Sequence, residues 1–347
     1  MRKRNLCCLF FVLLFAICFD KMAAQSIIVD TLMIDKISIR AIVVSAETVW
    51  YAADKDRFGT IDLKTKSKRE KKLSGNKDTE FRSIAETSSS IFVLTIGNPA
   101  LLYQISKKSG AIKLVYQENH EKVFYDSMQF WNDKEGIAIG DPTENAFSII
   151  TTHDGGNSWK KMPSSELPKL EDGEAAFAAS NTNIVIKGDK TWIVSGGTKA
   201  RIFFSLNKGK SWEIYNTPIV QGKSMTGIFT ADFYDPENGF IAGGDYEKPN
   251  QNFLNKAITV DGGKTWKLIA ENAGFGYASC IQYVPKSKGR QLVCVGASGL
   301  YYSADRGVSW IKLSENKDLF TIRFLDEKTA IAAGNNKILK LQFNFLN

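Results

Sequence analysis

The sequence of 347 residues is poor in the side chains that most often bind metals or carry redox chemistry. It has only two histidines and five cysteines, and Cys7, Cys8 and Cys18 lie near its N-terminus. No Cys-x-x-Cys pair is present, so we expect no metal site, no redox centre and no bound cofactor. Cys280 and Cys294 lie in one predicted hairpin, where they either form a disulfide or remain two small buried side chains.

Long hydrophobic runs are absent beyond the N-terminus. Arg-Lys-Arg at positions 2–4 precedes an apolar run from Leu6 to Phe19, and Ala23-Ala24-Gln25 fits a signal-peptidase site. We therefore predict a signal peptide over residues 1–24 and an exported protein that is periplasmic or extracellular. The run is too short to predict a transmembrane anchor. Lipidation of Cys18 is the less favoured alternative, because Ile17 fits poorly before a lipidated cysteine.

Acidic residues are the minority, since 45 Lys and Arg face 37 Asp and Glu and give a net charge of +8. Much of the local excess lies in the run Lys64–Lys72, which could attract an acidic partner or lipid head groups. A solvated outer edge that blocks strand pairing is the favoured interpretation of this run. Because the run has no interleaved aromatic residues and the chain is predicted to be exported, we do not expect nucleic-acid binding.

What the sequence does contain is one short motif in four copies, beginning at Thr152, Ser205, Thr259 and Ser303. Each copy reads Ser/Thr-x-Asp/Asn-x-Gly-x-Ser/Thr-Trp, the pattern of an Asp box (BNR repeat), which is a tight turn between outer strands of a propeller blade. The Asp or Asn oxygen accepts backbone N–H groups, the glycine allows a positive φ, and the tryptophan packs between sheets. We assign a structural role to Asp154, Trp159, Asn207, Trp212, Asp261, Trp266, Asp305 and Trp310.

The motif recurs every 44 to 54 residues, a period typical of stacked repeats. Two weaker copies without tryptophan lie at Thr60–Thr65 and Gln104–Gly110, and three further strands follow from Thr321 to Leu341. The strand missing from that last unit is predicted to be Ile27–Met33. We therefore predict an all-β, seven-bladed β-propeller with Asp-box turns, closed by the N-terminal strand and forming one domain over residues 25–347.

Propellers most often bind ligands at one mouth of the central channel, built from the starts of the innermost strands and the loops between second and third strands. The predicted ligand-binding residues at this mouth are Arg40, Arg82, Arg201, Arg323 and Asp141. Arginine forks bind carboxylate, sulfate or phosphate groups bidentately. Carboxylates beside a tyrosine could perform acid–base or nucleophilic chemistry on a sugar. The catalytic candidates are accordingly Asp126, Glu174, Asp245 and Tyr246. The alternative is structural, with arginines and carboxylates paired to hold blades together.

Several phrases resemble the photosystem II stability/assembly factor family of Asp-box propellers. They are Phe124–Ser127 with Gly136–Pro142, Gly173–Ser180 and Gly243–Tyr246. The resemblance covers residues 38–341 and is to bacterial, non-photosynthetic relatives, whose propellers are of the WD40/YVTN-like kind. It implies a binding or assembly scaffold. Such relatives are often described as oxidoreductases, but this sequence has no dinucleotide-binding fingerprint to support that activity.

Two functions are compatible with these patterns. The first is a secreted or periplasmic scaffold that binds an envelope or extracellular protein through one face of its channel. The second is a carbohydrate-active enzyme, a sialidase-like glycoside hydrolase or lyase acting on an anionic sugar. The sequence lacks the Arg-Ile-Pro that sialidases carry, which favours the scaffold. Whether the chain is an enzyme stays open, although a glycosidase or lyase is favoured over an oxidoreductase, and we expect a monomer.

Overall fold

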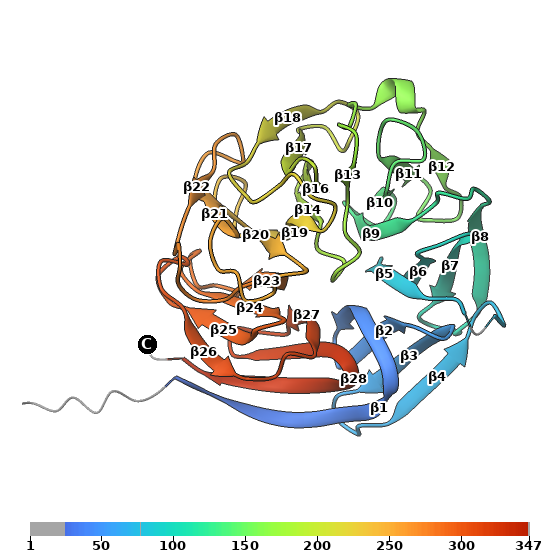
Figure 1. Cartoon of the computed structure of the whole chain (residues 1–347). Coiled ribbons are helices and arrows are strands. Elements are labelled where there is room, and N and C mark those ends of the chain that lie inside the picture. Colours follow the sequence, from blue (N-terminus) through green and yellow to red (C-terminus); the bar gives the residue numbers. More distant parts are fainter. Residues whose placement is uncertain (1–24, 77, 346–347) are drawn as a thin grey trace, which may run out of the picture.

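The computed structural model describes residues 25–76 and 78–345, which form a β-propeller (Figure 1). The strands are hydrogen-bonded into six sheets arranged around a central axis. The predicted signal peptide, residues 1–24, lies outside the described residues. Within the described part of the chain, no helix is both long enough and apolar enough to cross a membrane.

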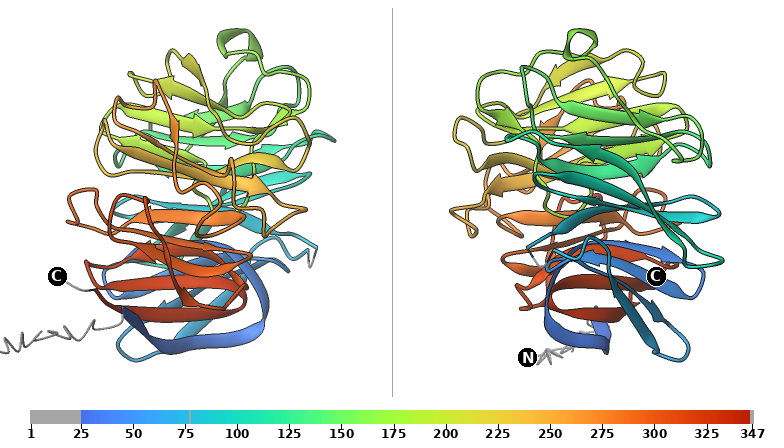
Figure 2. Two further views of the ribbon diagram at one scale, coloured as in Figure 1. Left: turned by 60° about the vertical axis from the view of Figure 1, so that its left-hand side comes forward. Right: turned by 90° about the vertical axis from the view of Figure 1, so that its right-hand side faces the viewer.

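The four-stranded sheets are antiparallel meanders whose first strand lies nearest the central axis (Figures 1 and 2). Four sheets have four strands: β5 (Phe81–Glu86), β6 (Ser90–Thr95), β7 (Ala100–Ser106) and β8 (Ile112–Glu118); β9 (Tyr125–Phe130), β10 (Gly136–Gly140), β11 (Ser148–Thr152) and β12 (Lys160–Lys161); β14 (Ile184–Lys187), β15 (Lys190–Val194), β17 (Arg201–Ser205) and β18 (Glu213–Asn216); β23 (Ala278–Tyr283), β24 (Leu292–Gly296), β25 (Gly299–Ser303) and β26 (Ile311–Ser314).

A short 3-10 helix, η1 (Ser164–Glu166), lies between β12 and β13. The two remaining sheets have six strands each. The first of these sheets contains β27 (Leu319–Phe324), β28 (Thr329–Asn344), β1 (Ser26–Ser45), β2 (Thr48–Ala53), β3 (Arg57–Asp62) and β4 (Lys68–Lys72). The second contains β13 (Glu174–Ala175), β16 (Gly196–Gly197), β19 (Thr226–Phe233), β20 (Gly239–Asp245), β21 (Lys256–Thr259) and β22 (Lys267–Leu268).

The prediction of seven blades is wrong, because the strands form six sheets. The difference lies in β1, which pairs with β28 from Ser26 to Ser38 and with β2 from Ile39 to Ser45. Figure 1 shows β1 running beside β28 along the outer edge and then turning toward the centre. The segments predicted as a first blade and a separate last blade, closed by an N-terminal strand, therefore belong to one hydrogen-bonded sheet.

The four motif copies fold into similar turns, and the indole N–H of the tryptophan is hydrogen-bonded in the third and fourth copies. In the third copy, Asp261 accepts the backbone N–H of Thr265 at 3.0 Å and its hydroxyl at 2.6 Å. Thr259 Oγ1 donates to Asp261 at 2.7 Å and accepts the N–H of Gly263 at 2.9 Å. The indole N–H of Trp266 donates to the Gly263 carbonyl at 2.9 Å. The same side-chain bonds form around Asp154 and Asp305. Around Asn207 the pattern differs in one bond, because the amide nitrogen of Asn207 donates to the Ser211 hydroxyl at 2.9 Å.

Aromatic side chains fill the space between neighbouring sheets. Trp192 of β15 is fully buried, stacks on Phe233 of β19 at a centroid distance of 4.1 Å, and donates its N–H to Gly262 O at 2.8 Å. Phe92 of β6 packs on Phe130 of β9 at 4.8 Å. Truncating one such aromatic residue costs about 3–5 kcal/mol, so these contacts stabilise the packing of adjacent sheets.

The strand register decides the state of the two remaining cysteines. Cys280 lies opposite Val295, whereas Cys294 lies opposite Ile281. Because successive residues of a strand point to opposite faces, the two sulfur atoms lie on different faces of the sheet. Both cysteines are free and buried, so they serve as small core residues.

Candidate functional site

Six innermost strand segments carry a β-bulge at the same place, close to one mouth of the channel. At each bulge one residue has no direct partner in the second strand. A bulge bends the strand and changes the direction of the extra side chain. The bulged residues are Arg40, Arg82, Asp126, Phe229, Ser279 and Phe320. This repeated irregularity supplies many of the side chains at and below the mouth.

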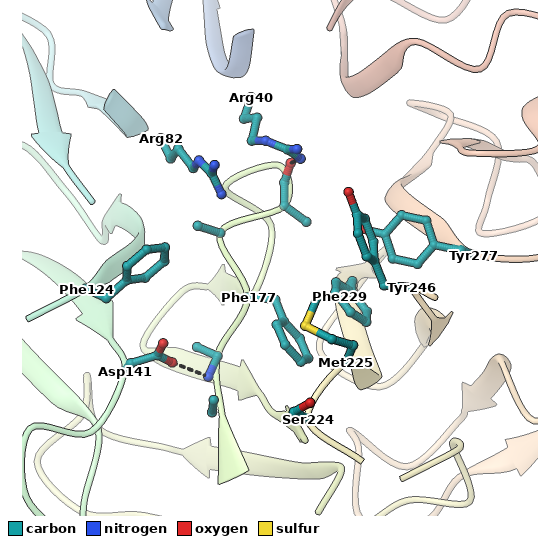
Figure 3. A pocket seen from close by; sticks show the side chains of 14 residues that line it. Arg40, Arg82, Phe124, Asp141, Phe177, Ser224, Met225, Phe229, Tyr246 and Tyr277 are labelled. Carbon is teal, nitrogen blue, oxygen red and sulfur yellow. Dashed lines mark hydrogen bonds between the residues drawn. The ribbon is translucent and has the colours of Figure 1, made fainter. Parts of the chain in front are cut away.

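A cavity of about 430 Å³ lies at this mouth (Figure 3). Of the predicted residues, it brings together Arg40, Arg82, Asp141 and Tyr246. In Figure 3 the two arginines lie on one side of the cavity and a group of aromatic side chains lies on another. Its composition is therefore divided between a cationic part and an apolar part.

The aromatic part is built from four rings that pack on one another. Phe177 stacks on Phe229 with ring centroids 3.9 Å apart and nearly parallel planes. Tyr277 meets the edge of Phe229 at 4.8 Å and of Tyr246 at 5.1 Å. Tyr246 is 46% exposed, so it presents a ring and a hydroxyl group to solvent at the rim of the cavity. Such rings bind apolar and aromatic groups with little loss of conformational entropy.

The two arginines differ in how their charge is compensated. Arg82 forms a fork with Glu80, with Nε–Oε1 at 2.7 Å and Nη2–Oε2 at 3.2 Å. Arg40 lies over the ring of Phe320 at 4.2 Å and donates from Nη1 to the Ala179 carbonyl at 3.3 Å. Among the described residues, Arg40 forms no ion pair with a carboxylate, and its buried Nε has no hydrogen-bond partner. Burial and the nearby charge of Arg82 lower the pKa of Arg40.

Two carboxyl groups lie near the arginines. Asp141 lines the cavity and accepts the N–H of Ala176 at 2.9 Å, and burial raises its pKa to about 6. Asp126 is completely buried, and neither of its oxygen atoms has a hydrogen-bond partner among the described residues. Burial and the neighbouring Asp141 raise the pKa of Asp126 well above its ordinary value. Asp126 thus belongs to the wall of the channel, whereas Asp141 lines the cavity itself.

The other predicted residues lie outside this cavity. Glu174 and Arg201 form a buried ion pair, with a second bond between Arg201 Nε and Glu174 Oε1 at 2.9 Å. Asp245 is buried and accepts the N–H of Glu247 at 3.0 Å. Arg323 lies three residues beyond Phe320, which occupies the bulge position, and lines a different cavity. Its guanidinium donates to backbone carbonyls, including Ser180 O at 3.0 Å.

The chain itself occupies the centre of the ring. After β13, residues 176–183 reach inward (Figure 1), and residues 175–179 line the cavity. Asn181 donates to Ile84 O of β5 at 2.8 Å and accepts the N–H of Met128 of β9 at 2.9 Å. Ser180 donates to Ser279 O of β23 at 2.6 Å. Further bonds reach β1, β19 and β27. This central segment therefore ties the innermost strands together and forms the floor of the cavity.

Sequence reasoning missed most of the aromatic residues of the site. Phe229 and Phe320 occupy the same bulge position as Arg40 and Arg82, so a comparison of all innermost strands irrespective of charge would have found them. Phe177 belongs to a segment whose position at the centre depends on contacts with distant strands, which no local pattern reveals.

Comparison with known proteins gives the class of the fold. No protein-family model and no curated protein matches the chain. Solved structures do match it, and they are β-propellers, including YCF48 (a photosystem II assembly factor) and WD40 propellers.

The structure of YCF48 bound to D1 peptide shares 13% sequence identity with the chain at a TM-score of 0.66, covering 92% of this chain and 96% of that one. YCF48 from Cyanidioschyzon merolae shares 11% identity at a TM-score of 0.63, covering 91% and 98%. U3-55K shares 10% identity at a TM-score of 0.67, covering 90% and 98%. At these identities the likeness concerns the fold, and it supports a propeller that resembles YCF48.

Proposed function

We propose that this protein is an exported binding or assembly scaffold that holds a segment of a partner protein in the cavity at the channel mouth. The segment we expect is acidic and carries an aromatic or large apolar side chain. The similar structure of YCF48 with a bound peptide supports peptide binding by a propeller of this shape. The predicted signal peptide supports a partner in the cell envelope or outside the cell.

The observation that carries this proposal is the guanidinium of Arg40. It lies in the cavity wall beside Arg82, whose charge is already matched by Glu80. A partly buried cation without a carboxylate partner is costly, and an anionic ligand would remove that cost. The stacked rings of Phe177 and Phe229 lie in the same cavity, so one ligand can meet the charge and the apolar surface together.

The carbohydrate-active alternative draws less support from this geometry. Of the four catalytic candidates, Tyr246 alone lines the cavity. Glu174 is held in its ion pair with Arg201, and Asp126 lies buried in the channel wall. The candidates therefore do not form a pair of carboxyl groups that faces a common ligand, as the acid and the nucleophile or base of a glycosidase do.

Fluorescence anisotropy with defined peptides tests the proposal. The reference peptide contains glutamate and phenylalanine; one variant peptide replaces phenylalanine by alanine, and another replaces glutamate by glutamine. We expect the reference peptide to bind residues 25–347 most tightly. Arg40→Gln should weaken its binding by about tenfold, in line with the loss of a desolvated charge contact. Phe229→Leu should reduce the preference for phenylalanine over alanine.

Lys286→Gln is the matched control, because it removes one positive charge from the other cavity, which Arg323 also lines. It should leave the affinity for the reference peptide unchanged. The proposal is contradicted if the three peptides bind equally, if none of them binds, or if Lys286→Gln weakens binding as much as Arg40→Gln does. Melting temperatures of all variants show whether each one remains folded.

A further inference from the structure

A second candidate site lies on the outer rim, between the first sheet and the turn that joins β7 to β8. A groove of about 290 Å³ is lined there by β2, β3, β4 and residues 105–110. Trp50 lines it and stacks on Phe58, with ring centroids 5.9 Å apart and planes 24° apart. The groove therefore offers an aromatic wall, and it shares no lining residue with the cavity at the channel mouth.

Positive charges surround this aromatic wall. Arg69, Lys71, Lys107 and Lys108 line the groove. Lys107 is matched by Glu86 at 2.6 Å, but the other three cations form no ion pair with a carboxylate among the described residues.

One carboxylate lines the groove, and it is already hydrogen-bonded to neighbouring side chains. Glu70 accepts two hydrogen bonds from Arg57, at 2.9 and 2.8 Å, and one from the Tyr51 hydroxyl at 2.7 Å. The groove therefore carries an excess of positive charge that its own residues do not balance.

We propose that this groove binds an acidic polysaccharide. The C–H groups on one face of a pyranose ring can pack on the Trp50 ring, because the face of an aromatic ring is electronegative. Carboxylate or sulfate groups on the same sugar unit or the next one would then meet Arg69, Lys71 and Lys108. No residue that lines the channel-mouth cavity also lines this groove, so the two proposals are independent.

The shape of the surface favours a polysaccharide over a lipid membrane. All residues of β4 are exposed, and all of them are charged. The aromatic rings lie within the groove, and Phe58 is only 4% exposed. A protein surface that binds a membrane needs protruding apolar groups that insert among the lipids, whereas a chain of sugar rings can enter a groove.

Isothermal titration calorimetry with a heparin hexasaccharide tests this site. Wild-type residues 25–347 should bind it, and Arg69→Gln/Lys71→Gln/Lys108→Gln should weaken binding by about tenfold or more. Trp50→Ala should also weaken binding, and Trp50→Phe should restore most of it because a ring is retained. The charge-matched control Lys160→Gln/Lys264→Gln/Lys267→Gln removes exposed lysines from other sheets and should bind like wild type.

Three comparison ligands separate the alternatives: polyglutamate, neutral maltohexaose and phosphatidylglycerol vesicles. The hexasaccharide should bind more tightly than polyglutamate of equal charge, and maltohexaose should not bind. The proposal is overturned if polyglutamate binds as tightly, if the control triple variant loses as much affinity, or if Trp50→Ala binds unchanged. Binding to vesicles but not to the hexasaccharide would also overturn it. Arg40→Gln should leave hexasaccharide binding intact, so failure at one site is distinguishable from failure at the other.

Discussion

Replacing Arg201 by methionine should destabilise the protein strongly, because it removes one partner of a buried ion pair. The side chain of Glu174 has no exposed surface, and that of Arg201 is 11% exposed. Without Arg201, the hydrogen-bond donors left to the Glu174 carboxylate among the described residues are the Ser195 hydroxyl at 2.6 Å and the N–H of Glu171 at 3.0 Å. Breaking a buried pair in this way costs about 3–5 kcal/mol of unfolding free energy.

Removing both charges should cost less than removing one. The variant Glu174→Met/Arg201→Met leaves no unpaired buried charge, so it should be more stable than Arg201→Met alone by about 1–3 kcal/mol. Lys312→Met is a control that breaks the exposed pair between Lys312 and Glu315, with its N–O distance of 3.0 Å. Because such surface pairs contribute about 0–1 kcal/mol, this control should be nearly neutral.

Urea denaturation of residues 25–347, followed by tryptophan fluorescence, measures these differences. The reasoning is refuted if Arg201→Met loses less than about 1 kcal/mol at an unchanged m-value. It is also refuted if the double variant is no more stable than Arg201→Met. The expected result would support a structural role for Glu174, as the buried partner of Arg201, over a catalytic one.

Three further predictions follow from single residues. Gly156→Ala should destabilise far more than Gly188→Ala in the same denaturation assay, because both glycines have positive φ but only the new Cβ at position 156 would lie 2.2 Å from the Phe92 ring; equal losses would contradict the packing. Partial burial raises the pKa of Asp261, but the hydrogen bonds in its turn outweigh burial, so the folded pKa lies below the unfolded one. The stability that Asp261 contributes is therefore present above the unfolded pKa and is lost as pH falls through the folded value, so Asp261→Asn should lose less unfolding free energy between about pH 5 and 2. Burial raises the pKa of Asp141 to about 6, so affinity for the acidic peptide should increase as pH falls through that value, and Asp141→Asn should remove this dependence in anisotropy titrations.

Local patterns in the sequence group two of the predicted residues that share one cavity in the structure. Ile39–Ile42 and Phe81–Ile84 repeat one pattern, and the structure places Arg40 and Arg82 in the same cavity. The two residues come together because a β-bulge recurs at one place in the innermost strands, so equivalent positions in the sequence are equivalent in space. The propeller fold itself was predictable for the same reason, since a repeat is a local signal.

Features that depend on long-range pairing were not predictable. The number of sheets depends on β1, which runs without a break from its pairing with β28 to its pairing with β2, and no local pattern shows that these two segments form one strand. Glu174 of β13 pairs with Arg201 of β17, whereas the sequence analysis had placed the two residues at the mouth as separate candidates. Phe177 enters the cavity because the segment after β13 is held at the centre by bonds to strands far away in the sequence.

The central claim is that an acidic peptide binds at the channel mouth, and photo-crosslinking tests it most directly. The reference peptide, carrying a diazirine, would be crosslinked to residues 25–347 and the adducts mapped by mass spectrometry. Our account predicts adducts in residues 224–229 and at Tyr246, and their loss in Arg40→Gln. Adducts confined to the cavity lined by Tyr234 and Tyr283, or to the rim groove beside β4, would contradict it.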